Sequence, residues 1–125
     1  MITEDYVSFE VAKLLKEKGF DIPLNYFYNS DGRKCYATSY NWNQTTGDFQ
    51  DYSCPTLQMA MKWLREVHKI EIYPYHQNSE TCTNWWFEIE NYQSLVNEYE
   101  SNAIYATYEE AVEAGIRYCL EMLVK

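Results

Sequence analysis

Glycine and proline are scarce in this chain of 125 residues, which contains four glycines and three prolines. The glycines all stand alone, so no glycine-rich loop of the kind that cradles a phosphate group is present. Four cysteines are too few for the disulfide framework of a small secreted scaffold. No apolar run approaches the ~20 residues of a membrane-spanning helix, and the N-terminal residues lack the basic part of a secretory signal. We therefore expect a cytoplasmic protein with reduced thiols.

Basic residues are also few, with 10 Lys and Arg against 19 Asp and Glu, which gives a net charge of −9. The imbalance lies mainly in residues 69–125, which hold 10 acidic and three basic residues. Proteins that bind duplex DNA neutralise its phosphates with Lys and Arg, so nucleic acid is not an expected partner. An acidic surface favours a basic protein partner, or it serves only to keep the protein soluble.

Motifs of catalysis and metal binding are missing as well. The chain has no Gly-x-Ser-x-Gly, no His-Glu-x-x-His and no Cys-x2-Cys. His76 and Cys82 bracket a short segment but lack the paired ligands that a zinc site needs. Glu88 and Glu90 would lie about 7 Å apart on one strand, which is near a glycosidase separation, but strand neighbours more often form a solvated face. We expect no enzymatic activity, no metal and no cofactor.

Aromatic residues are abundant instead, at 18% of the chain, with 13 Tyr, five Phe and four Trp. Apolar residues recur at helical spacing in three segments, within 4–18, from about 57 to 68, and from about 108 to 123. Thr3 and Ser8 are the candidate N-caps of the first helix, and Thr3 is favoured because Glu4 and Asp5 then occupy the first turn. Gly19 marks the end of this helix, with Phe20 folded back onto the last turn. Thr107 and Glu110 form a capping box that opens the third helix.

Alternating residues between turn signals predict four strands in two hairpins, 24–28 with 34–42 and 70–76 with 85–92. Pro74 cannot donate a ladder hydrogen bond, so strand 70–76 is expected at an edge or a bulge. Residues 43–53 read as a loop, and residues 93–106 as a short helix or a long loop. The order α-β-β-α-β-β-α predicts one α+β domain over residues 1–125, with an antiparallel four-stranded sheet and helices mainly on one face.

The chain also contains a candidate internal repeat. A shift of 49 residues aligns residues 13–31 with residues 62–80 and gives six identities, against about one expected from composition. The matches join helix end to helix end and turn to turn, so a duplicated α-β-β unit is one explanation. Coincidence between two amphipathic helix-strand units is the other.

The second hairpin supplies the candidate binding site. Side chains alternate across a strand, so if Ile70 and Ile72 face the core, their neighbours face outward. We call the outward set the acidic aromatic face; its members are Glu71, Tyr73, Tyr75, Trp86, Glu88 and Glu90. The first hairpin is expected to add Tyr36, Tyr40 and Trp42. Tyr and Trp are frequent in binding hot spots, whereas a face covered by another segment would make these residues core.

Two long segments and two short ones carry a resemblance to a known group. The long segments are residues 54–68 (CPTLQMAMKWLREVH) and 7–20 (VSFEVAKLLKEKGF), and the short ones are 109–111 (EEA) and 118–121 (YCLE). Together they resemble short uncharacterised proteins of gut Bacteroidales genomes that often occur in prophage or mobile-element settings. The group has no established activity, so the resemblance implies no site residue. It implies a small cytoplasmic accessory protein in a phage-related context.

The sequence therefore predicts a non-enzymatic protein that binds an unknown, basic protein partner. The acidic aromatic face, or the acidic flank of the third helix at Glu109, Glu110 and Glu113, would dock onto that partner, with charge steering the encounter. One alternative is a small-molecule or carbohydrate site in an aromatic pocket near Trp86. Another is a homodimer-forming structural module whose aromatic face is self-complementary. A flat face favours a protein partner, and a closed pocket favours a ligand.

Overall fold

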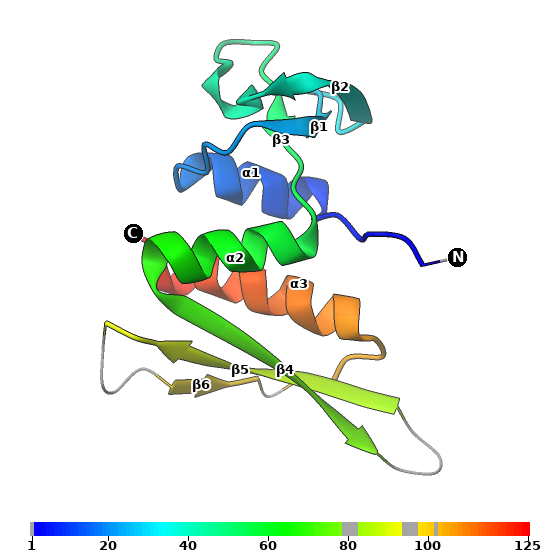
Figure 1. The fold of residues 1–125 in the computed structure, drawn as a ribbon, viewed down its shortest axis with the longest axis vertical. Coiled ribbons are helices and arrows are strands. Elements are labelled where there is room, and N and C mark those ends of the chain that lie inside the picture. Colours follow the sequence, from blue (N-terminus) through cyan, green and yellow to red (C-terminus); the bar gives the residue numbers. More distant parts are fainter. Residues whose placement is uncertain (1, 79–82, 94–97, 102) are drawn as a thin grey trace.

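The computed structural model describes residues 2–78, 83–93, 98–101 and 103–125. Its helical elements are α1 (Phe9–Glu17), a 3₁₀ turn η1 (Trp42–Gln44), α2 (Leu57–His68), α3 (Tyr108–Tyr118) and a π-helical turn η2 (Cys119–Leu123). Its strands are β1 (Leu24–Tyr28), β2 (Lys34–Tyr40), β3 (Tyr52–Ser53), β4 (Ile70–Asn78), β5 (Thr83–Asn91) and β6 (Glu98–Glu100). Figure 1 shows the three helices as a central layer with one sheet on either side.

The protein is α+β, but the prediction of a single four-stranded sheet with helices on one face is wrong. Two antiparallel sheets of three strands form instead, with strand orders β2-β1-β3 and β4-β5-β6. The third strand of each sheet comes from a segment that was not predicted to be a strand. Strand β3 lies at the end of residues 43–53, which were predicted as a loop, and β6 lies within residues 93–106, which were predicted as a short helix or a long loop. Each hairpin thus forms a separate sheet, and each sheet buries one face against the helices. Helix α1 packs on β3, while α2 and α3 pack on the β4–β6 sheet.

Side-chain caps fix where the helices begin. Thr56 Oγ1 accepts a hydrogen bond from Met59 N (3.1 Å), and Thr107 Oγ1 accepts one from Glu110 N (3.1 Å), as the capping pattern at Thr107 predicts. The prediction of Thr3 as the first cap is wrong, because Ser8 caps α1. The chain before Ser8 runs extended, with Val7 N donating to Pro55 O at 3.1 Å, so no helix can begin there.

The core lies between the helical layer and the β4–β6 sheet, and between the helical layer and β3. Gly115 lies on the buried side of α3, where a Cβ atom would stand 3.0 Å from Ile72 Cγ2 and 3.4 Å from the Phe87 ring. The groups that approach this glycine are therefore side chains of β4 and β5. The small residue allows α3 to lie close against the sheet that carries the acidic aromatic face.

Pro74 lies on an edge strand, as predicted, because β5 is the one strand among the described residues that pairs with β4. Tyr92 N donates to Lys69 O at 2.8 Å, which makes this a hydrogen-bonded pair of the antiparallel ladder. In this register Pro74 lies opposite Phe87, midway between hydrogen-bonded pairs, so its missing N–H would point to the free edge. Proline at this position protects the edge against pairing with another strand.

The two halves of the candidate repeat have the same element order, since α1-β1-β2 aligns with α2-β4-β5. Their third strands join opposite members of the hairpin: β3 pairs with β1, and β6 pairs with β5. Duplication of an α-β-β unit therefore stays a prediction. Strands β3 and β6 are not part of the repeated unit. Among the described residues, no helix has the length and apolar character to cross a membrane.

Candidate functional site

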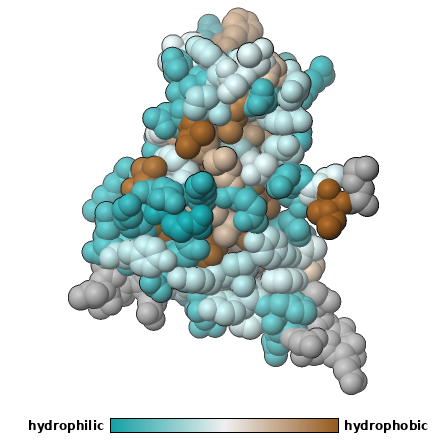
Figure 2. Space-filling view, viewed as in Figure 1, coloured by the Kyte–Doolittle hydropathy of each residue, from teal (hydrophilic) through white to brown (hydrophobic). Residues whose placement is uncertain are grey.

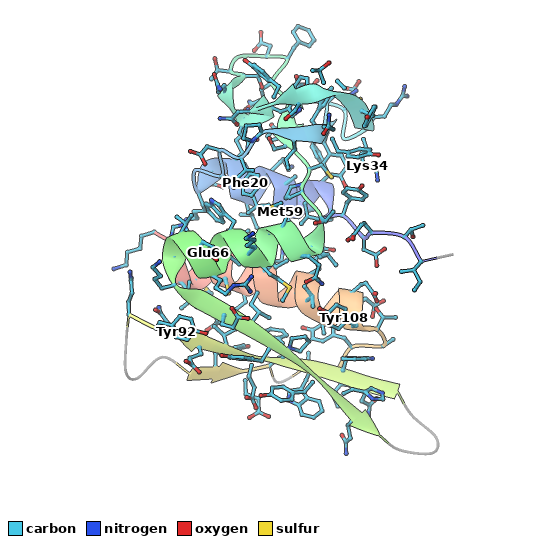
Figure 3. The ribbon with its side chains drawn as sticks, viewed as in Figure 1. Phe20, Lys34, Met59, Glu66, Tyr92 and Tyr108 are labelled. Carbon is cyan, nitrogen blue, oxygen red and sulfur yellow. The ribbon has the colours of Figure 1, made fainter. Side chains whose placement is uncertain are left out.

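The six residues of the acidic aromatic face share one side of the β4–β6 sheet. Three cross-strand pairs contain them: Glu71 opposite Glu90, Tyr73 opposite Glu88, and Tyr75 opposite Trp86. The intervening residues Ile72, Phe87 and Ile89 are buried against the helices. Figure 3 shows side chains of β4 and β5 projecting from the sheet on the side away from the helical layer. The alternation along these strands is therefore as the sequence predicts.

None of the helices in the described part of the chain covers this face (Figure 1). The segments that could have covered it lie elsewhere: α1 belongs to the helical layer, residues 43–53 lie beyond that layer (Figure 1), and residues 98–101 lie beside β5 at the sheet margin. Tyr75 is 40% exposed, and its ring stacks on the half-buried Trp86 ring with centroids 5.6 Å apart and an interplanar angle of 19°. In Figure 2 the surface over this sheet is pale to teal, so the face is amphipathic rather than strongly hydrophobic.

Strand β6 adds a residue that the sequence did not reveal. Glu100 lies opposite Glu88, on the same side of the sheet. Its strand has only three residues, too few to show a periodic pattern. Together with its neighbours it borders a hollow of about 420 Å³, which is lined by Tyr73, Tyr75, Glu88, Ile89, Glu90, Tyr99 and Glu100.

Carboxylates face one another across this sheet. Ser101 N donates to Phe87 O at 2.9 Å, so the next pair along, Glu88 with Glu100, is a non-hydrogen-bonded pair, the kind in which side chains lie closest. Like charges directly opposite one another destabilise a sheet by roughly 0.2–1 kcal/mol. Glu71, opposite Glu90, is partly compensated by Arg65, whose Nη1 lies 3.3 Å from Glu71 Oε2.

The surrounding sequence supplies little positive charge to this sheet. Residues 70–116 contain nine acidic residues and no Lys or Arg. The negative field affects the tyrosines: the charge of Glu88 raises the pKa of Tyr75 above its usual value. The pKa of Tyr73 is also raised, mainly because its hydroxyl hydrogen-bonds the Tyr92 hydroxyl at 3.2 Å. The face therefore combines phenol rings with several carboxylates, of which Glu71 is paired with Arg65.

The aromatic residues of the first hairpin do not join this face, so the prediction that Tyr36, Tyr40 and Trp42 extend it is wrong. Tyr36 and Tyr40 belong to β2, and Trp42 begins the turn η1 that follows it, on the other side of the helices (Figure 1). The Trp42 ring stacks on Phe27 at 4.0 Å, and its Nε1 donates to Leu24 O at 2.7 Å. The physical reason is that β1 pairs with β2 and β3 in a sheet of its own rather than with the second hairpin.

The acidic flank of α3 is largely engaged in capping. Glu113 Oε1 accepts a hydrogen bond from Ser8 N at 2.6 Å, and so supports the start of α1. Glu110 Oε2 accepts one from Ala106 N at 3.1 Å. Glu109 and Glu110 are exposed, and Glu113 is half-buried. This flank is therefore a weaker docking candidate than the sheet face.

Nucleophilic and metal-binding chemistry finds little support in the described part of the chain. Burial raises the pKa of the Cys54 thiol to about 11 and that of the Cys119 thiol to about 12, so neither is a ready nucleophile. His76 is exposed and packs on Trp85 with ring centroids 4.7 Å apart, while Cys82 lies outside the described residues. Within the described ranges, no three His, Cys, Asp or Glu side chains gather as metal ligands.

Comparison with known proteins gives no match: no protein-family model, no curated protein and no solved structure matches the chain. The resemblance to the Bacteroidales group therefore stays a prediction. Functional assignment depends on the chemistry of the site.

Proposed function

We propose that the protein binds a basic segment of another protein on its acidic aromatic face. The observation that carries the proposal is the unrelieved pair of Glu88 and Glu100, which flanks two tyrosines in a sheet without Lys or Arg. Such a pair costs stability in the free protein. A bound cation would remove that cost, so the arrangement is favourable only in a complex.

The chemistry of the face suits Arg and Lys side chains of the partner. A cation in the hollow would lie between the carboxylates of Glu88, Glu90 and Glu100 and could contact the rings of Tyr73 and Tyr75. Carboxylate pairing and cation–π contact each favour such a group, and both strengthen as the interface loses water. The stacked rings of Tyr75 and Trp86 offer rigid apolar area beside it. The net negative field would also accelerate encounter with a basic partner.

The other candidate functions fit this face less well. A hollow of about 420 Å³ has the size of a small-molecule site, but three bordering carboxylates favour a cation over a neutral sugar. A homodimer through this face would bring two sets of carboxylates together, which like-charge repulsion opposes. A basic protein segment is the occupant that uses both the charge and the rings.

Titration with a synthetic peptide of alternating arginine and serine tests the proposal, with a glutamate–serine peptide of equal length as the control. We expect the basic peptide alone to bind, with amide shifts in NMR spectra confined to β4, β5 and β6. The double variant Glu88→Gln/Glu90→Gln should weaken binding about tenfold. Glu17→Gln/Glu66→Gln changes the net charge equally at exposed helix positions and should leave the affinity unchanged.

Three results would overturn the proposal. They are an absence of binding, an equal loss of affinity in both double variants, and binding of argininamide alone as tight as that of the peptide. The last result would assign the hollow to a small cation.

The variant Trp86→Ala distinguishes a Trp86 side chain that contacts the bound peptide from one that stabilises the hydrophobic core. Because Trp86 lies half-buried on the outer side of the sheet, its truncation should weaken peptide binding while the melting temperature falls by only a few degrees, about 1–2 kcal/mol. Calorimetry of the free variant gives the melting temperature, and the peptide titration gives the affinity. A loss of about 3–5 kcal/mol, typical of a buried tryptophan, would place Trp86 in the core.

A further inference from the structure

The β2-β1-β3 sheet has a free edge at β2, on the side of the helices opposite the acidic aromatic face (Figure 1). Asn29 N donates to Arg33 O at 3.0 Å, and Phe27 lies opposite Cys35, two residues along each strand. These are hydrogen-bonded pairs of the antiparallel ladder. The alternate residues of β2 in this register, Lys34 and Tyr36, therefore turn their backbone N–H and C=O groups away from β1.

The two long edge strands of the molecule differ in how they are protected. On β4, Pro74 removes a donor from the free edge. Strand β2 contains no proline, and its single charged residue is Lys34. The Lys34 ammonium lies 4.0 Å from the centre of the Tyr6 ring. Its charge is therefore directed towards Tyr6 and does not protect the free edge against pairing. Tyr36 is 71% exposed beside these free backbone groups.

We propose that β2 pairs antiparallel with β2 of a second copy of this chain, which joins two three-stranded sheets into a continuous sheet of six strands. A two-fold axis near the middle of the strand brings the outward backbone groups of Tyr36 onto those of Tyr36 in the other copy, or onto those of its Thr38 when the axis passes one residue further along. The lone charge of the strand then lies opposite an uncharged residue: Thr38 when the axis passes through Tyr36, or Tyr40 when it passes one residue further along. The pairing is therefore self-complementary.

Charge also favours a second copy at this end of the molecule. Residues 24–53 carry three acidic and two basic residues, whereas residues 70–100 carry six acidic residues and no Lys or Arg. Two copies that meet through β2 place their least charged sheets together and their acidic sheets far apart. The dimer would present one acidic aromatic face at each end, but pairing through β2 does not require those faces to bind anything.

Sedimentation over a concentration series tests the pairing, with a mass-action shift from monomer to dimer as the expected result. Tyr36→Lys and Tyr36→Glu each place like charges opposite or diagonal to one another across the axis. Each variant alone should dimerise at least about tenfold more weakly. An equimolar mixture of the two variants should recover a heterodimer. Thr46→Lys and Thr46→Glu make the same charge changes at an exposed position outside β2, and both variants should dimerise like the unaltered protein.

Three results would overturn the pairing. The unaltered protein could remain monomeric throughout the series, both Tyr36 variants could dimerise as it does, or the mixture of folded variants could fail to associate. Circular dichroism of each variant establishes that it is folded before it is mixed. Glu88→Gln/Glu90→Gln should dimerise normally, so loss of the pairing and loss of peptide binding are separate outcomes.

Discussion

Replacing Glu88 by Gln should stabilise the free protein, although the substitution removes a charged group from the centre of its candidate site. Glu88 and Glu100 lie opposite one another in the closer type of cross-strand pair. Glutamine keeps the shape of the side chain and removes only the charge. If the repulsion between these carboxylates is real, either Glu88→Gln or Glu100→Gln relieves it.

The expected gain in the free energy of unfolding follows from the distance between the two carboxylates. Two unit charges about 6 Å apart in water repel by about 0.7 kcal/mol, a magnitude similar to the roughly 0.2–1 kcal/mol by which favourable cross-strand pairs stabilise a sheet. For a chain of this length that corresponds to a rise in melting temperature of roughly 2–4 °C. The double variant should gain little beyond either single variant, because both substitutions remove the same interaction. The coupling free energy should therefore be close to the single-variant gain.

Thermal and urea unfolding at low ionic strength measure these differences, and calorimetry gives the enthalpy for the conversion. At about 1 M NaCl, where the Debye length is ~3 Å, the gain should largely disappear. Glu17→Gln, at an exposed helix position, is the matched control and should change stability little under either condition. The reasoning is refuted if Glu88→Gln destabilises the protein at low salt, or if the two substitutions add without coupling.

Three further predictions concern titratable groups. Since the charge of Glu88 raises the pKa of Tyr75, Glu88→Gln should lower that pKa towards about 10, as followed by the ring carbon shift of Tyr75 in NMR spectra; an unchanged value contradicts the assignment. Burial lowers the pKa of His68 in the folded state, so stability should fall as the pH drops below about 6.5, and His68→Gln should reduce that fall in urea titrations at each pH. Among the three thiols that the structure describes, Cys35 should react first with a thiol reagent under native conditions, as peptide mapping would reveal, because the other two are buried.

Local rules account for much of the fold. Three amphipathic segments become α1, α2 and α3, and Gly19 follows the first with a φ of +94°, while Phe20 N donates back to Leu15 O at 3.0 Å. The turn at Asn29 also depends on its neighbours, since its Oδ1 accepts hydrogen bonds from Asp31 N and Arg33 N, both at 3.0 Å. Alternation along β4 and β5 predicts which side each residue of the acidic aromatic face occupies.

Other features depend on contacts that no local pattern encodes. Extended residues before Ser8 pair with the segment around Pro55, which moves the cap of α1 from the predicted Thr3 to Ser8. Strands β3 and β6 have two and three residues, too few for a period, and they form because each finds an open edge of a longer hairpin.

The sequence by itself determined which segments form the three helices, where the first hairpin turns and which side of β4 and β5 the residues of the acidic aromatic face occupy, because neighbours within a few positions govern caps, turns and alternation. Only the tertiary structure decided how the strands are shared between sheets. Because the two hairpins belong to different sheets, Tyr36, Tyr40 and Trp42 lie away from the acidic aromatic face. Because β6 pairs with β5, Glu100 lies on that face. Strand pairing joins residues far apart in the chain, and its outcome depends on which apolar faces the helices can bury together.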